Sequence, residues 1–229
     1  MQSQAMIKNI AGCRAFDFQI ISPEKEEYEH VQRAIARKYH KVYEADVQPT
    51  PDMFAVLKKA PLLGDGIFGA CFGITSAIVS LFSEQYLTAP LQQIIHQQLG
   101  RMVARSDIAE VGSVVASGVP NSGKDLLEMM PGLLWSMGFE VVLITATKQI
   151  RSVLEATNIP FRPIASARPE KLKSHQTDWG SYYDNDPVTG VIDIKAAILS
   201  TLFAHFSKKF AVERFDIGPS AYVQEGFLK

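Results

Sequence analysis

Apolar positions recur along the chain with two different periods, which together predict a mixed helix and strand structure. Residues 28–42 carry apolar side chains at three- and four-residue spacing, as expected for a helix with one buried face. Ser22, Pro23 and Glu24 precede this stretch and favour a helix start, because serine caps free N–H groups and proline suits the first helical position. Short apolar runs between turn residues predict strands at 14–21, 53–58, 67–77, 108–116, 141–146 and 161–165.

Further helices are expected at residues 88–99, 123–137, 148–157 and 191–207. The Asp65-Gly66 pair favours a hairpin before the strand at 67–77, so the early strands should be antiparallel. Strands and helices alternate after residue 108. The expected fold is therefore α/β of the α+β type, with a mixed, mostly antiparallel central sheet flanked by helices. One domain should span 1–190, and residues 191–229 should add a helix and tail that pack on this domain or in a homodimer interface.

Composition and charge narrow the classes of function. The chain has 229 residues, of which 47% are hydrophobic and 21% charged, enough for a core without disulfides or structural metal. Its net charge of −1 gives no electrostatic reason to expect a nucleic-acid partner. Cys13 and Cys71 lie in apolar surroundings without metal-ligand spacing, which favours buried thiols over a disulfide or a metal site. No export signal and no apolar run of about 18 residues are visible, so we expect a cytoplasmic protein without a spanning segment.

Residues 107–125 form the window most suited to binding a ligand. A predicted strand runs into a glycine-containing loop and then into a helix, an arrangement that points backbone N–H groups and the positive end of the helix dipole at an anion. Gly118, Ser122 and Gly123 permit close approach of the backbone, and Lys124 adds a positive charge. The sequence therefore predicts a phosphate-binding loop, although a glycine-rich turn without a ligand would have the same pattern.

The same loop nearly matches a nucleotide-binding P-loop. Gly118 to Lys124 have the spacing of that motif, but Asp125 stands where it needs a serine or threonine hydroxyl to bind magnesium. A carboxylate at that position would repel phosphates, and no acidic residue ends the next strand. Nucleotide hydrolysis is therefore the weaker alternative.

Three short motifs resemble the thermostable hemolysin family. They are EQYL at 84–87, EVGSVVAS at 110–117 and DWGSYY at 178–183, and the resemblance spans roughly residues 14–200. It implies a GNAT-like acyl-CoA N-acyltransferase fold with distant similarity to acyl-homoserine-lactone synthases. Ser113 stands in the region where those synthases carry an arginine, so their particular activity is not expected.

The resemblance also implies roles for individual residues. Glu110 would be the general base, and the backbone near Val114 and Val115 would pair with the pantetheine arm of acyl-CoA. The pyrophosphate would lie on the loop, whose binding residues are Gly118, Asn121, Ser122, Gly123 and Lys124. The usual proton-donating tyrosine is missing from 148–158, so Tyr182 or Tyr183 would replace it. The alternative is that their loop, residues 178–187, only caps the sheet with Trp179 packed beneath it. The loop also departs from the usual pattern at Pro120, where glutamine or arginine is typical.

The expected activity is transfer of an acyl group from acyl-CoA or acyl carrier protein to a small-molecule amine, without a metal. Glu110 also has a purely structural interpretation, as a strand glutamate held in an ion pair. Two other classes of function stay open. One is a membrane-active haemolysin, for which the sequence offers only the apolar helix at 192–206, a pattern more typical of a buried helix. The other is an inactive GNAT-like scaffold that binds a ligand or partner.

Overall fold

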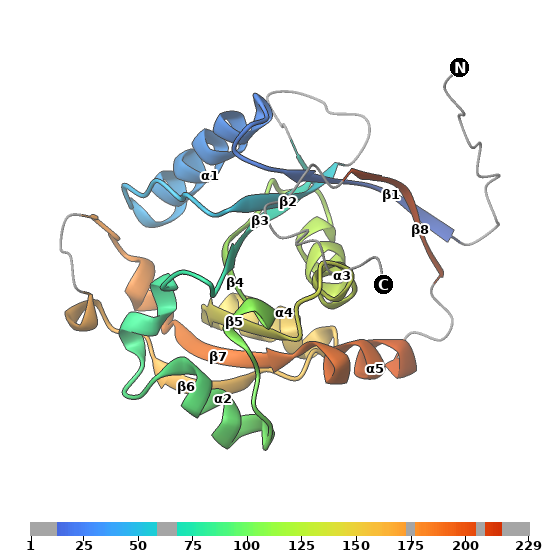
Figure 1. Ribbon diagram of the computed structural model, residues 1–229. Coiled ribbons are helices and arrows are strands. Elements are labelled where there is room, and N and C mark those ends of the chain that lie inside the picture. Colours follow the sequence, from blue (N-terminus) through green and yellow to red (C-terminus); the bar gives the residue numbers. More distant parts are fainter. Residues whose placement is uncertain (1–12, 59–67, 173–176, 205–208, 217–229) are drawn as a thin grey trace.

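A computed structural model describes residues 13–58, 68–172, 177–204 and 209–216, and one twisted sheet forms its centre (Figure 1). The eight strands lie in the order β6-β7-β5-β4-β3-β2-β1-β8. Their bounds are β1 Cys13–Ile21, β2 Met53–Lys58, β3 Ala70–Ser76, β4 Ile108–Ala116, β5 Val141–Ala146, β6 Arg162–Ser166, β7 Val188–Asp193 and β8 Lys209–Asp216. Five neighbouring pairs are antiparallel, and the pairs β4–β5 and β1–β8 are parallel. The expected mixed, mostly antiparallel sheet is confirmed.

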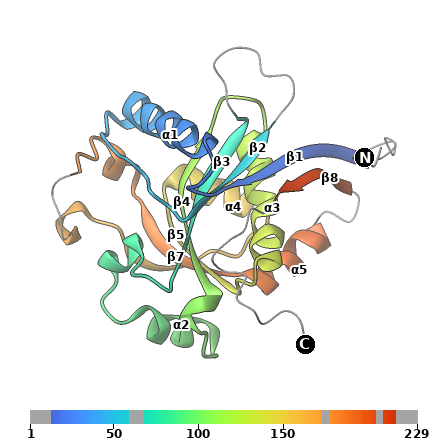
Figure 2. The same ribbon diagram turned by 45° about the horizontal axis from the view of Figure 1, so that its top comes forward.

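Helices cover both faces of the sheet (Figures 1 and 2). Their bounds are α1 Glu27–Tyr43, α2 Leu91–Leu99, α3 Ser122–Ser136, α4 Lys148–Ala156 and α5 Ile194–Ala204. Helices α3, α4 and α5 pack on one face, and α1 and α2 pack on the other. Short 3-10 helices include η1 (Phe82–Tyr86) and η4 (Tyr182–Asn185).

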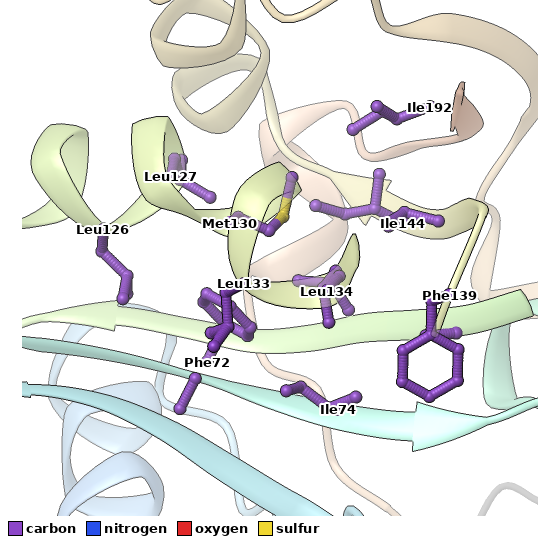
Figure 3. Packing of buried hydrophobic residues seen from close by; sticks show 14 of the residues in the cluster. Phe72, Ile74, Leu126, Leu127, Met130, Leu133, Leu134, Phe139, Ile144 and Ile192 are labelled. Atoms are coloured by element: carbon purple, nitrogen blue, oxygen red, sulfur yellow. The ribbon is translucent and has the colours of Figure 1, made fainter. Parts of the chain in front are cut away.

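The largest core cluster lies under α3 (Figure 3). Met130 and Leu134 of this helix are fully buried among side chains of β3, β5 and β7, including Phe72, Ile144 and Ile192. Because the strands contribute alternate residues to each face, their other side chains fill separate clusters under α1 and α2. This packing fixes β4 and β5, which carry the candidate site.

Helix α1 begins later than the sequence predicts. Its buried stripe of Tyr28, Val31 and Ile35 is as expected, but the helix starts at Glu27, and its N-terminus has no side-chain cap. The segment after Ser22 forms a turn in which the Lys25 N–H donates to the Ser22 carbonyl at 3.0 Å. The prediction of a serine cap at Ser22 is therefore wrong, because the chain first turns away from β1.

The region around residue 191 also differs from the prediction. Residues 191–193 belong to β7, and α5 starts only at Ile194. Val191 packs toward α2 and Ile192 toward α3, so this apolar run alternates between two cores as a strand does. The expected domain boundary at 190 falls within β7. The strand β8 was not expected at all.

Some expectations fall outside the part of the chain that the structure describes. These are the turn at 64–66, the N-terminal segment 1–12 and the side chain of Cys13. Cys71 is a buried free thiol, as predicted.

Candidate functional site

The strands β4 and β5 pair over only part of their length. Their parallel ladder joins Ile108–Val111 to Val141–Ile144 and ends there, although β4 continues to Ala116 along β3. The register with β3 shifts just past this point, and Ser113 has a left-handed φ of 54°. An extra residue of this kind forms a β-bulge, which bends its strand. Within the described residues, the β4 edge that faces β5 therefore has no ladder partner from residue 112 onward.

Val114 and Val115 lie on this unpaired stretch. Val114 is partly buried against the α3 core, and Val115 is buried toward α1. Their side chains anchor the two faces of β4, so their backbone groups are held at the open edge. Both residues lie on the part of β4 that has no partner in β5.

The loop after β4, residues 117–121, is exposed, and hydrogen bonds at both of its ends hold it to Gly69, next to β3. The Gly69 carbonyl accepts hydrogen bonds from the Ser117 N–H at 2.9 Å and hydroxyl at 3.0 Å, and from the Ser122 hydroxyl at 2.8 Å. Gly118 has a φ of 96°, which favours glycine. Asn121 is exposed directly before α3, while Ser122 is fully buried. The Ser122 hydroxyl thus shapes the loop.

Gly123 and Lys124 form the first turn of α3 and are partly buried. A Cβ atom at Gly123 would lie 3.2 Å from the Ala116 Cβ, so glycine allows the helix to approach β4 closely. The N-terminus of α3 carries the positive end of its helix dipole. Of the predicted phosphate-binding residues, the structure therefore brings Gly118, Asn121, Gly123 and Lys124 together around an accessible helix start.

Glu110 lies on the α2 face of β4, next to the point where the ladder with β5 ends. The residue is 8% exposed. One carboxylate oxygen accepts a hydrogen bond from the Phe82 N–H at 2.8 Å, and the other accepts from the Ser83 N–H at 2.9 Å and from the Ser83 hydroxyl. Burial raises the pKa of Glu110, while the hydrogen bonds from Ser83 and Phe82 act in the opposite direction. Among the described residues Glu110 has no ion-pair partner. Instead it binds the first N–H groups of η1.

The EQYL motif holds η1 against Glu110. The Glu84 carboxylate accepts a hydrogen bond from the Leu81 N–H at 3.0 Å and forms a partly buried ion pair with Arg105. Arg105 also donates to the carbonyls of Ala77 and Val79, so it fastens the segment that leads into η1. The Glu84–Arg105 pair therefore positions the two N–H groups that donate hydrogen bonds to Glu110.

An aromatic cluster joins η1 to the DWGSYY motif. The hydroxyls of Tyr86 and Tyr183 lie 2.7 Å apart, and the rings of Phe82 and Trp179 have centroids 5.4 Å apart. The full cluster consists of Tyr39, Tyr43, Phe82, Tyr86, Trp179, Tyr182 and Tyr183. The short helix η1 thus links the motifs, because it contacts Glu110 of EVGSVVAS through Phe82 and Ser83, and Tyr183 of DWGSYY through Tyr86.

The two candidate proton donors differ in their surroundings. Tyr182 is buried among the rings of this cluster, and burial raises its pKa well above the ordinary value. Tyr183 is partly buried, and burial likewise raises its pKa. Both phenols therefore keep their protons at neutral pH. The Tyr183 hydroxyl is hydrogen-bonded to that of Tyr86, and the pKa of Tyr86 is raised first by burial, then by Tyr183 and by the nearby Glu110 charge.

Three hydroxyl side chains near Glu110 were not predicted from the sequence. The Ser83 Oγ lies 2.7 Å from the Thr145 Oγ1, which lies 2.8 Å from the Thr189 Oγ1. These residues come from η1, β5 and β7, which the sheet brings together. Serine and threonine in a strand or a short turn carry no local signal of such a contact, so only the fold could reveal it.

The described residues contain no group of three histidine, cysteine, aspartate or glutamate side chains placed to hold a metal ion. None of the helices within those residues combines the length and apolar character needed to cross a membrane.

Solved structures similar to this one define the fold as GNAT-like. The acyl-homoserine-lactone synthase LasI is 10% identical, with a TM-score of 0.54 over 87% of this chain and 98% of that one. BjaI, a CoA-dependent acyl-homoserine-lactone synthase solved with SAM and isopentyl-CoA, is 12% identical, with a TM-score of 0.51 over 88% and 96%. FeeM, an N-acyl amino acid synthase from uncultured soil microbes, is 11% identical, with a TM-score of 0.50 over 83% and 99%. At these identities the likeness concerns the fold alone.

The family follows from the sequence itself. The thermostable hemolysin family model matches residues 21–198, which is most of the chain. The protein belongs to the thermostable hemolysin family, as its three motifs indicate. A search among curated proteins gave no match.

Proposed function

We propose that the protein transfers an acyl group from acyl-CoA or acyl carrier protein to the amine of a small-molecule acceptor. The observation that carries the proposal is the end of the β4–β5 ladder at Val111 and Ile144, beside the buried carboxylate of Glu110. An unpaired strand edge offers backbone N–H and C=O groups to an extended amide-containing ligand, and a pantetheine arm is such a ligand. A carboxylate with a raised pKa next to that edge suits proton removal from an amine.

The loop and the start of α3 would bind the phosphates. In this proposal the pyrophosphate lies against the exposed residues 118–121 and the first turn of the helix. Lys124 and the helix dipole supply positive charge, and Gly118 supplies the backbone turn. The pantetheine arm then runs along the β4 edge at Ser113 to Val115, with the thioester toward Glu110.

The chain's own residues then have separate tasks. Glu110 receives a proton from the acceptor amine, so that the neutral nitrogen can attack the thioester carbonyl. Holding both reactants at the open edge removes much of the entropic barrier to their encounter. Tyr183 is the better placed of the two tyrosines to protonate the leaving thiolate, because Tyr182 is buried within the aromatic cluster.

Binding can be tested by thermal unfolding with CoA, octanoyl-CoA and ATP with magnesium. A ligand at about 100 times its dissociation constant stabilises the folded state by roughly 2.7 kcal/mol. We expect the CoA compounds to stabilise the protein more than ATP does, and we expect Lys124→Glu and Gly123→Asp to weaken that effect. Lys124→Glu is the easier variant to interpret, because a side chain at Gly123 would also make a close contact with Ala116.

Two matched controls separate local from general charge effects. Lys195→Glu makes the same charge change on an exposed residue in the first turn of α5, which starts where β7 ends. Gly132→Asp adds a carboxylate to an exposed position of α3 that is far from its N-terminus, where the added Cβ meets nothing within 4 Å. Both controls should keep the CoA effect. If ATP with magnesium stabilises more and is hydrolysed, the P-loop interpretation replaces ours.

The alternatives predict other results. An inactive scaffold would bind CoA or another ligand without acylating any amine. A membrane-active haemolysin would release dye from liposomes whether or not Glu110 is present. Native mass spectrometry of freshly purified protein should show a retained CoA-sized or acyl-sized ligand if the acyltransferase proposal holds.

A further inference from the structure

A chain of side-chain hydroxyls runs from Glu110 to the place where β4 and β5 separate. The Ser83 hydroxyl donates to the Glu110 carboxylate. The Thr145 Oγ1 lies 2.7 Å from the Ser83 Oγ, and the Thr189 Oγ1 lies 2.8 Å beyond it. The chain crosses from η1 to β5 and then to β7.

The direction of these hydrogen bonds follows from the charge at one end. An ionised carboxylate can only accept, so Ser83 must give it its single proton. Ser83 can then only accept from Thr145, and Thr145 can only accept from Thr189. A hydroxyl oxygen has two lone pairs, so the Thr145 oxygen keeps one for a further donor. When Glu110 is protonated, both directions can reverse, so that Glu110 donates to Ser83 and Ser83 donates to Thr145.

Thr145 is the member of the chain that an incoming molecule can reach. Glu110, Ser83 and Thr189 are 8%, 1% and 0% exposed, whereas Thr145 is only partly buried. Thr145 also follows Ile144, the last residue of β5 that pairs with β4. Both carboxylate oxygens of Glu110, in contrast, are already bonded to η1. An amine at the open edge would therefore meet the Thr145 hydroxyl before it meets the carboxylate.

We propose that Thr145 and Ser83 relay a proton from the acceptor amine to Glu110, with Thr145 in contact with the amine and Ser83 as a positioning residue. This inference rests on the proposed acyltransferase function and names the path by which its base acts. Thr189 lies behind Thr145, away from Glu110, and takes no part in the relay.

The proton balance is complete without a further reactant. The acceptor ammonium gives one proton to the Thr145 oxygen as Thr145 passes its own to Ser83 and Ser83 passes its own to Glu110. The neutral amine then attacks the thioester carbonyl, so that a C–N bond forms and the C–S bond breaks with its electron pair on sulfur. Tyr183 gives its proton to the thiolate and takes up the second proton of the nitrogen in return. Glu110 later returns its proton to water by the same path.

The titratable groups packed around Glu110 are few among the described residues. On η1 they are Glu84, which is paired with Arg105, and Tyr86, which is bonded to Tyr183. The residues paired with Glu110 on the neighbouring strands are Thr75 and Leu143, which do not titrate. The rise of kcat on the acid side of its pH profile can therefore be assigned to the ionisation of Glu110.

The kinetic test uses octanoyl-CoA as donor, with amino acids and aliphatic diamines as acceptors, and measures release of the CoA thiol. Thr145→Val has nearly the same shape without the hydroxyl and should lower kcat about 10²-fold or more, the lower range for loss of acid–base catalysis. It should also flatten the rise of kcat with pH that follows ionisation of Glu110. Thr145→Ser restores the hydroxyl and should recover most of the turnover. Thr189→Val removes the neighbouring hydroxyl, which lies outside the relay, and this variant should keep most of the turnover.

The results for these variants distinguish a proton relay from a purely structural role of Thr145. Unchanged kcat and an unchanged pH profile in Thr145→Val would overturn the relay, and so would an equal loss in Thr189→Val. A rise in KM alone would also overturn it, because that result means that Thr145 only binds the acceptor.

A second measurement does not depend on activity. The pKa of Glu110 can be followed by NMR of its side-chain carboxyl carbon. Ser83→Ala should raise this pKa further, because the carboxylate loses a hydrogen bond. Thr145→Val should raise it by less, through weaker polarisation of Ser83. If wild-type protein acylates no amine, the proposed function fails and the relay fails with it, whereas the NMR result still tests the hydrogen bonds that join Thr145 and Ser83 to Glu110. An identical pKa in wild type and both variants would refute the relay.

Discussion

Replacing Glu110 by glutamine should destabilise the protein, although the two side chains have the same shape. The carboxylate accepts hydrogen bonds on both oxygens, from the N–H groups of Phe82 and Ser83 and from the Ser83 hydroxyl. A glutamine amide accepts on its oxygen only, and its NH₂ group donates. In either orientation of the amide, the NH₂ group therefore faces a backbone N–H of η1. One buried donor loses its acceptor.

The size of the effect follows from that single lost bond. A buried donor without a partner costs about 1–3 kcal/mol. For a protein of this size each kcal/mol lowers Tm by roughly 2–4 °C. Protonated Glu110, in contrast, can still accept from both N–H groups, because its hydroxyl oxygen keeps lone pairs and its proton can go to Ser83.

The stability gap should depend on pH. Burial raises the pKa of Glu110 above its ordinary value of 4.5. Such a group contributes stability that is fully present below the unfolded-state pKa and is lost as pH rises through the higher folded-state pKa. The glutamine variant has no such loss. Wild type should therefore exceed Glu110→Gln most clearly in acid, and the gap should narrow as pH rises.

Denaturant unfolding of both proteins at about pH 4 and about pH 8 measures this gap, since the lower pH lies below the ordinary glutamate pKa of 4.5 and the higher lies well above it. Glu155→Gln makes the same change at an exposed position of α4 and should stay within about 0.5 kcal/mol of wild type. The reasoning is refuted if Glu110→Gln is as stable as wild type at both values, or if the gap widens with pH.

Two further predictions concern other parts of the structure. Gly180→Ala should destabilise the protein by about 1–3 kcal/mol in denaturant unfolding, because its Cβ would lie 2.0 Å from the Tyr43 carbonyl oxygen at a φ of 47°. Gly132→Ala, in an open helical position of α3, should instead stabilise by roughly 0.5–1 kcal/mol, and equal effects of the two substitutions would contradict the argument. Cys71 is fully buried and burial raises its pKa, so peptide mapping should find it unalkylated in native protein and modified after unfolding. Rapid modification in native buffer would mean that α1 opens readily.

The sequence alone located the strands that carry the candidate site. The expected bounds 108–116 and 141–146 agree with β4 and β5, because each is an apolar run that ends at polar or glycine residues. The stripe of Tyr28, Val31 and Ile35 also gave the buried face of α1. The three motifs gave the family, and the family implied the fold.

The local sequence pattern gave the wrong secondary structure where neighbouring strands and packing determined it. Residues 191–193 read as the start of a helix, because an apolar run has no period of its own. They form a strand since β5 pairs with all three of them, β6 pairs with Val191, and cores lie on both faces. Ser22 has the chemistry of a helix cap, yet the path out of β1 required a turn before α1.

The surroundings of Glu110 were decided only by the tertiary structure. The sequence indicated this residue as a candidate base, but Ser83 is 27 positions away from it and 62 from Thr145. Helical and strand periods relate residues a few positions apart, so they hold no information about partners at such separations. The order of strands in the sheet brings these side chains together, and their hydrogen bonds form because buried polar groups must find partners where the fold places them.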